Sequence, residues 1–201
     1  GFSGQGGLLY RGIENARIGI NYRGPMTANL NGSGSLPEIG PDNVTTDFKF
    51  PGVLSFGASY QFTEQWLVSL NLDWEMWSSI DEIKRNYSNP ILSTVGTNSL
   101  ETEDSVSVRL GTVYNLSERS ALRGGYSYIS DAISPDNVPP TLQDFNIHSF
   151  AIGYSHGWGS YDVDIGYEFQ YMPERESRDV FFSGIHKKHI HSVFAGISYN
   201  F

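Results

Sequence analysis

The sequence predicts an all-β protein, an antiparallel β-barrel that spans a membrane. Apolar and polar residues alternate with a period of two along most of the chain, as on a strand with one apolar and one polar face. The connections between these segments alternate between short turns and long polar loops, which is the plan of transmembrane barrels. A soluble β-sandwich or lipocalin-like barrel also alternates, but we expect shorter strands and tight loops at both ends in that class.

Composition narrows the possible functions. The formal net charge is −9, so the chain lacks the basic surface that nucleic-acid phosphates require. It contains no cysteine, which excludes disulfides and thiolate metal sites. A run of about eighteen apolar residues, as a spanning helix needs, does not occur, but barrel strands escape that test. We expect a single barrel domain over residues 1–201.

The first half of the chain has four alternating segments. They are residues 4–11, which alternate weakly, and residues 16–23, 48–62 and 66–77. In the last of these, Leu70 and Leu72 alternate with polar residues. We therefore expect both leucines to contact lipid.

The second half has five more segments, which brings the prediction to eight strong strands and one weak one. They are residues 105–114, 121–128, 149–156, 161–171 and 191–201. Residues 161–171 alternate most clearly, and we expect Ile165 and Tyr167 to contact lipid there.

The connections differ in length from one end of the strands to the other. Short ones are residues 12–15, 63–65, 115–119 and 156–160, and long ones, predicted to be loops, are residues 32–43, 86–104, 130–146 and 173–187. Aromatic residues near the segment ends would form the interfacial girdles. They are Tyr10, Trp66, Tyr114, Trp158, Tyr161 and Tyr171.

The chain ends on Phe201, with Tyr199 two residues before it and apolar residues at alternate positions upstream. This ending resembles the C-terminal signal by which outer-membrane barrels are recognised for assembly. The resemblance implies that the barrel-assembly machinery is a partner.

Three stretches in order resemble the C-terminal part of the FadL/TodX family of outer-membrane transporters for long-chain fatty acids and other hydrophobic compounds. They are "GGLLYRGIENARIGINYRGPM", residues 48–83 with Pro51 and "WSSIDEI", and residues 122–156. The resemblance implies the C-terminal eight or nine strands of a fourteen-stranded barrel, without the N-terminal hatch and early strands. We therefore expect a curved antiparallel sheet with an open seam.

The resemblance also implies location and activity. We expect a monomeric, multi-pass barrel in the outer membrane of a Gram-negative bacterium, surrounded by outer-membrane lipids and lipopolysaccharide. It would admit a hydrophobic small molecule, such as a long-chain fatty acid or an aromatic hydrocarbon, by diffusion and without a cofactor. The alternatives are a general hydrophilic porin and a structural or lipid-modifying barrel. An enzyme would need a nucleophile beside a base, and no such motif appears.

Charged residues on the polar faces are the first site candidates. They are Arg17, Arg23, Asp73, Glu75, Arg109, Arg123, Asp162, Asp164 and Glu168. The neighbouring carboxylates of Asp162 and Asp164 suggest acid–base chemistry, because close carboxyls can split their pKa values. An ion-pair and hydrogen-bond network that fills the lumen is the interpretation that we favour.

Two further features are candidates for binding. His186, His189 and His191 include a possible metal pair, but a basic outer rim that meets lipid phosphates fits this stretch better. Trp77 is expected on the polar face of its strand near the outer end. There it would be either a girdle residue or a wall of the hydrophobic path.

Overall fold

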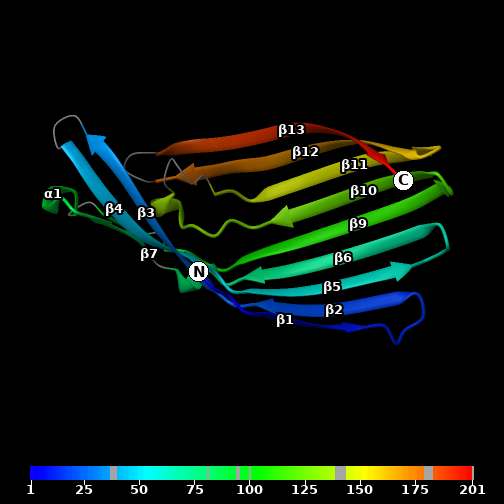
Figure 1. Cartoon of the computed structure of the whole chain (residues 1–201), viewed down its shortest axis with the longest axis horizontal. Helices are drawn as coiled ribbons and strands as arrows, with labels where there is room; N and C mark the ends of the chain where they lie inside the picture. The colour runs from blue at the N-terminus through cyan, green and yellow to red at the C-terminus, as the bar shows by residue number, and fades with distance from the viewer. Residues whose placement is uncertain are drawn as a thin grey trace.

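The computed structural model describes residues 1–36, 40–80, 82–93, 96–99, 101–138, 144–178 and 183–200. A nine-stranded antiparallel sheet dominates the chain, in the order β1-β2-β5-β6-β9-β10-β11-β12-β13 (Figure 1). Its strands are β1 (Gln5–Tyr10), β2 (Ala16–Arg23), β5 (Val53–Gln61), β6 (Trp66–Glu75), β9 (Ser105–Ser117), β10 (Ser120–Ile129), β11 (Ile147–Trp158), β12 (Tyr161–Ser177) and β13 (Gly184–Tyr199).

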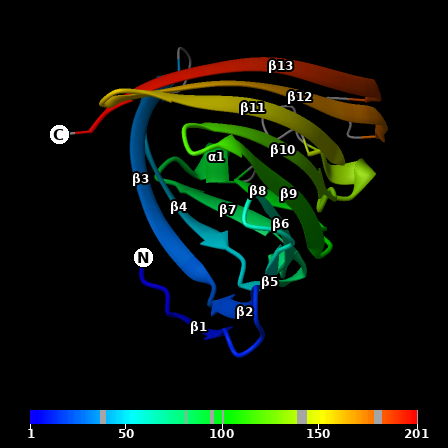
Figure 2. The ribbon, with the colours of Figure 1, turned by 90° about the vertical axis from the view of Figure 1, so that its right-hand side faces the viewer.

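The main sheet curves into an arc that runs from β1 to β13 (Figure 2). β1 and β13 are its edges, and the described residues form no ladder between them. The predicted curved, open, nine-stranded antiparallel sheet is therefore confirmed. Among the helices of the described residues, none is long and apolar enough to span a membrane.

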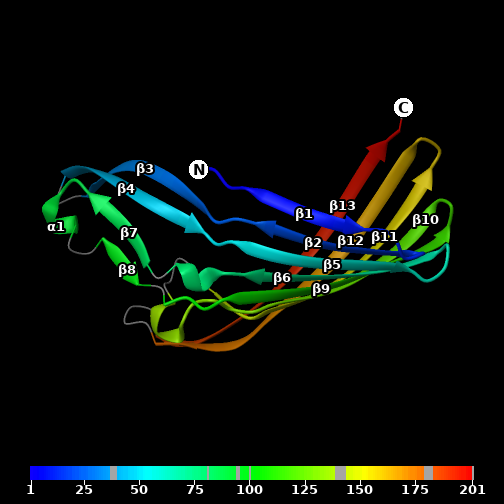
Figure 3. The ribbon, with the colours of Figure 1, turned by 90° about the horizontal axis from the view of Figure 1, so that it is seen from below.

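A second, four-stranded sheet adjoins one end of the main sheet (Figures 1 and 3). Its strands are β3 (Met26–Leu36), β4 (Gly40–Phe50), β7 (Glu82–Tyr87) and β8 (Thr97–Ser99). Short helices are α1 (Pro90–Ser93) and the 3-10 turns η1 (Trp77–Ser79) and η2 (Pro135–Asn137). We call this end of the main sheet the loop end, and the opposite end the turn end.

Two predictions for this region are wrong. Residues 32–43, predicted to be a loop, belong mostly to the β3–β4 hairpin, whose register runs from Met26↔Phe50 to Leu36↔Gly40. Residues 48–62, predicted to be one strand, split at Pro51 into β4 and β5, which lie in different sheets. Proline lacks the N–H that would continue the ladder, so the strand ends there.

The register sets the two faces of the main sheet. Leu72 lies opposite Phe56 on β5 and Val108 on β9, so apolar residues share one face. Asp73 lies opposite serines on the same two strands, which form the polar face. On the apolar face, Leu72 is 38% exposed, Ile165 56% and Tyr167 40%. These three side chains, for which the sequence predicts lipid contact, are thus exposed on the apolar face.

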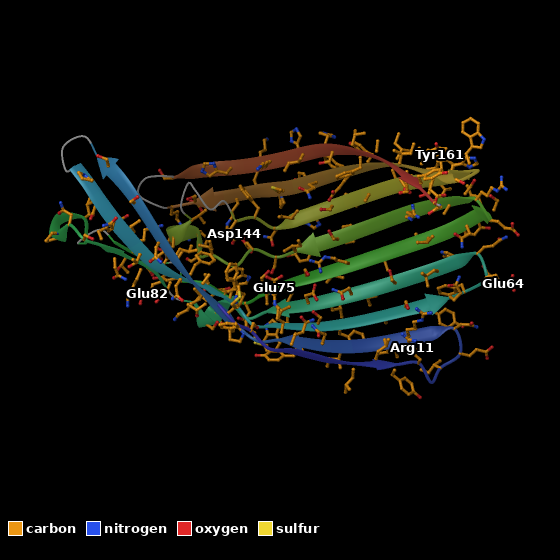
Figure 4. All side chains as sticks on the ribbon, in the orientation of Figure 1. Arg11, Glu64, Glu75, Glu82, Asp144 and Tyr161 are labelled. Carbon is orange, nitrogen blue, oxygen red and sulfur yellow. The ribbon has the colours of Figure 1, made fainter. Side chains whose placement is uncertain are left out.

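Tight hairpins join the strands at the turn end, where Figure 4 labels Arg11, Glu64 and Tyr161. One of the two-residue turns joins Trp158 to Tyr161, and in it Gly159 has a φ of +62°. Glycine adopts this left-handed conformation without Cβ strain. Five of the six predicted girdle aromatics cluster at the turn end, and Tyr171 lies near the loop end.

The buried apolar residues of the described chain gather at the loop end. They are Ile80, Ile133, Val138, Phe145 and Met172. Elsewhere the sheet has one apolar face that remains exposed and one polar face. The small core therefore lies where the second sheet and the β10–β11 segment (residues 130–138 and 144–146) meet the main sheet.

Candidate functional site

A cavity of about 250 Å³ lies at the loop end, between the two sheets. Glu75 and Asp144, labelled in Figure 4, mark its position. Its walls come from β4, β6, β7, β9, β10, η1 and the β10–β11 segment, and they are mostly apolar. The lining residues are Phe48, Lys49, Glu75, Trp77, Ile80, Ile83, Thr102, Ser105, Ile129, Ser130, Ala132, Ile133 and Asp144.

One wall is held by hydrogen bonds around Trp77. Its indole Nε1 donates to Glu75 Oε2 at 2.9 Å. The hydroxyl of Thr102 lies 2.6 Å from the carbonyl oxygens of both Trp77 and Ile80. Trp77 begins η1 rather than continuing its strand, so its predicted place on a strand face is wrong. From this turn, Trp77 lines the cavity.

The β10–β11 segment supplies the facing wall. Ile133 forms an antiparallel bridge with Thr102, and Glu103 N–H donates to the Ala132 carbonyl at 2.6 Å. The carboxylate of Asp144 accepts from the backbone N–H groups of Ala132 (2.6 Å) and Ile133 (2.7 Å). These contacts fix the segment against the start of β9 and close that side of the cavity.

Arg175 holds this wall from behind. Its side chain is 10% exposed and pairs with Asp144 at 3.1 Å and Asp131 at 3.4 Å. It also donates to the backbone carbonyls of Ile133 and Asp144. The β12–β13 register shifts between Met172 and Arg175, and this irregularity turns Arg175 to the inward face that Met172 already occupies.

The sequence analysis missed Arg175, although it carried a signal. Pro173 lies within β12, where a residue without an N–H indicates a bulge. A bulge reverses the alternation beyond it, so Arg175 faces inward instead of outward. The sequence analysis also missed four other lining residues. Three of them lie in segments predicted to be loops, namely Thr102, Ile133 and Asp144, and the fourth, Lys49, lies in a segment predicted to be an apolar strand.

The cavity's carboxylates already have structural donors. Glu75 accepts from Trp77, and Asp144 accepts from two backbone N–H groups and Arg175. Lys49 on β4 is the basic residue among the described lining groups. The remaining surface offers apolar contact and a few hydroxyl groups, so the cavity suits an apolar or weakly amphipathic molecule.

Asp104 supports η1 from outside the cavity. It accepts from the Ser78 N–H at 3.0 Å and the Trp74 indole at 2.8 Å. Hydrogen bonds from the side chain and backbone of Ser78, and then from Trp74, hold the pKa of Asp104 below its usual value. Its ionised form therefore stabilises the turn that carries Trp77.

The predicted lumen residues form two separate ion pairs on the polar face. Arg109 pairs with Asp73, which also accepts from Asn71 at 2.8 Å. Arg123 pairs with Asp164 at 3.2 Å. The first pair lies on β6 and β9, and the second joins β10 to β12.

The other lumen candidates lie apart from these pairs. Asp162 accepts from Asn200 at 2.7 Å, and Glu168 accepts from Gln170 at 2.9 Å. Arg17 lines an open hollow of about 550 Å³ on β2, β5, β6 and β9, together with Arg109. Arg23 ends β2 near the second sheet. Glu75 alone of the predicted set lines the loop-end cavity.

In the part of the chain that the structure describes, the histidines belong to no group of three potential metal ligands. The rings of His189 and His191 lie edge to face, with centroids 5.9 Å apart on β13. In the predicted assembly signal, Tyr199 packs against Tyr161 at 4.9 Å. Phe201 lies outside the described residues.

Comparison with known proteins establishes the family. Residues 1–180 match the family model described as outer membrane protein transport protein (OMPP1/FadL/TodX). The chain belongs to this family. It is 24% identical to outer membrane protein P1 of Haemophilus influenzae over 177 residues, which are 84% of this chain and 38% of that protein.

Solved structures agree on the fold. A Pseudomonas aeruginosa FadL homologue superposes with a TM-score of 0.77 at 15% identity, over 96% of this chain and 50% of that chain. The Pseudomonas putida toluene transporter TodX superposes with a TM-score of 0.70 at 20% identity, over 99% and 49%. The chain thus spans about half the length of these two structures and 38% of the length of outer membrane protein P1. It is an outer-membrane protein that crosses the membrane with β-strands.

Proposed function

We propose that this chain forms part of an outer-membrane channel for passive uptake of hydrophobic compounds. We further propose that the loop-end cavity binds these compounds along the uptake route. The mostly apolar cavity carries the proposal. Its position at the loop end would let it receive a molecule before that molecule reaches the polar face of the barrel.

The substrate class follows from the cavity walls and from the relatives. Phe48, Trp77 and several isoleucines provide apolar contact, and Lys49 provides one cation. TodX is a toluene transporter by name, and the family resemblance extends to long-chain fatty acids. We infer that the ligand is an aromatic hydrocarbon or the end of a fatty acid.

A hydrophilic porin is the rival channel. The open hollow on the polar face, lined by Arg17 and Arg109, would suit water and sugars. The cavity walls and the family favour the hydrophobic route. A lipid-modifying enzyme would require a nucleophile beside a base, and the family is a transport family.

The test uses the full-length protein reconstituted into lipid vesicles. We expect uptake of radiolabelled toluene or oleate to rise above that of empty vesicles, and uptake of labelled sucrose to stay at the empty-vesicle rate. Sucrose flux without toluene or oleate uptake would replace this proposal with the porin. Release of fatty acid from labelled phospholipid would replace it with the enzyme.

A further inference from the structure

Two rows of aromatic and histidine side chains cross β10 to β13 on the apolar face, near the loop end. The register places the members of each row directly opposite one another on neighbouring strands. The outer row is Tyr128, His148, Tyr171 and His189, and the inner row is Tyr126, Phe150, Phe169 and His191. We call these eight residues the aromatic–histidine belt.

Ring contacts join neighbouring members of the belt in two groups, one on β10, β11 and β12 and the other on β12 and β13. The rings of Tyr128 and His148 are 5.0 Å apart, and those of Tyr126 and Phe150 are 5.2 Å apart. Phe169 and His191 are also 5.0 Å apart. Packing of this kind holds the rings in place, so the polar atoms at their edges keep fixed positions.

Tyrosine hydroxyl groups orient two of the imidazoles. The hydroxyl of Tyr126 lies 2.9 Å from His148 Nδ1, and that of Tyr167 lies 2.6 Å from His191 Nδ1. When a hydroxyl donates to Nδ1 of a neutral ring, the ring proton is on Nε2. Each ring then has an N–H donor on the side away from its tyrosine.

The charge of this region differs from that of the rest of the chain. Residues 186–191 contain three of the five histidines and two lysines of a protein whose net charge is −9. The belt itself contains no carboxylate. Beside it, Lys187 lies 3.4 Å from Glu174, and both side chains are largely exposed. The belt therefore offers donors to an anion, with little competition from acceptors of its own.

Outer-membrane barrels carry short turns on the periplasmic side and longer loops on the extracellular side, so the loop end meets the outer leaflet. We propose that the aromatic–histidine belt binds the phosphate group of a lipid headgroup in that leaflet. Toward the turn end, the same face continues as exposed apolar side chains, which include Ile152, Ile165 and Val193. Donors at the border of an apolar surface match a phosphate that sits above acyl chains. A free phosphate ion would gain nothing from that apolar surface.

The turn end provides an internal control. His156 lies on the same strand as His148, and its Nδ1 is 2.8 Å from the Ser120 hydroxyl. Its ring stacks on Tyr154. This histidine stands at the opposite membrane boundary, about one strand length from the belt, so its replacement tests for general effects of losing an imidazole on the lipid face.

The test measures binding of radiolabelled lipid A, a phosphorylated glycolipid, to the full-length protein in detergent. We expect the double variant H189Q/H191Q to bind about tenfold more weakly, and H156Q to bind as the unmodified protein does. Dephosphorylated lipid A should bind no better than the double variant binds lipid A. Inorganic phosphate at the same concentration should not displace the lipid.

Three results would overturn the proposal: equal binding of dephosphorylated lipid A, an equal loss in H156Q, or displacement by inorganic phosphate. Heat-modifiable migration on gels checks that each variant is folded. If the double variant does not fold, Y126F/Y167F replaces it, because this change removes only the two hydroxyls that orient the imidazoles. That variant should also lose affinity for lipid A, and unchanged affinity would again overturn the proposal.

Discussion

Arg175 Nη1 lies 3.1 Å from Asp144 Oδ2, so one guanidinium on β12 holds a carboxylate that lines the cavity. The same arginine reaches Asp131 and the Ile133 carbonyl. A single side chain thus fixes three points of the β10–β11 segment.

Arg175→Met should therefore destabilise the loop end by about 3 kcal/mol, because it leaves two carboxylates without their cation in a largely buried place. Binding of labelled toluene or oleate should weaken as the cavity wall loosens. Urea unfolding and equilibrium binding of the full-length protein measure the two effects. Arg178→Met is the matched control, since Arg178 pairs with Asp136 on the same segment but both side chains are more than half exposed. Its cost should stay below about 1 kcal/mol, and an equal cost for both variants would contradict this role of Arg175.

Filling the loop-end cavity with a larger side chain should block binding of the hydrophobic ligand. Ala132→Phe places a ring in the lining, while the backbone N–H that donates to Asp144 remains. We expect affinity for labelled toluene or oleate to fall by at least about tenfold. Ala151→Phe adds the same ring to the polar face of β11, outside this cavity, and should leave affinity unchanged. Unaltered affinity in Ala132→Phe would remove the cavity from the route.

A charged side chain on the apolar face of β6 should destabilise the protein. Leu72→Arg should cost about 2 to 4 kcal/mol if the position is near the bilayer midplane, whereas Asn71→Arg on the polar face should cost much less. Unfolding of both variants in lipid vesicles measures the difference. Equal tolerance of the two arginines would show that the faces are assigned the wrong way round.

Asp104 should make the loop end sensitive to acid. Its pKa is lowered in the folded chain, so its contribution to stability is present above the ordinary carboxyl pKa of about 3.9 and is lost as the pH falls through the lowered value. The unmodified protein should therefore be more stable than Asp104→Asn at pH 6, and the gap should shrink toward pH 3. Urea midpoints at several pH values report it, with Asp136→Asn as an exposed control. A gap that does not change with pH would rule out this linkage.

The strands of the main sheet could be predicted because the alternation of residue types within each strand reflects the environment of its two faces. Alternation in residues 161–171 reflects one face toward lipid and one toward water, and no distant contact is needed to recognise it. The register of Tyr167 against Val193 and Ile152 then follows from matching faces. Strand number and the open antiparallel order were accessible for the same reason.

The loop end could not be predicted in this way. β3 and β4 lie beyond the main sheet and carry many Gly, Asn, Ser and Thr residues, so their pattern resembles that of loops. The cavity joins residues far apart in sequence, such as Phe48 and Asp144, and their meeting depends on tertiary structure. Arg175 required the bulge at Pro173 to be recognised, because without it the alternation assigns this arginine to the opposite face.

The position of the buried apolar cluster has a consequence for temperature. Ile80, Ile133 and Phe145 are shielded from water by protein, whereas the apolar residues along the middle of the strands are exposed, on the side that faces lipid in an outer-membrane barrel. Hydration of apolar surface gives unfolding its large heat-capacity change, so that change belongs chiefly to the loop end. Cooling weakens this part of the chain and leaves the lipid-facing wall nearly unaffected. In the cold, the loop end would loosen before the strands of the main sheet do.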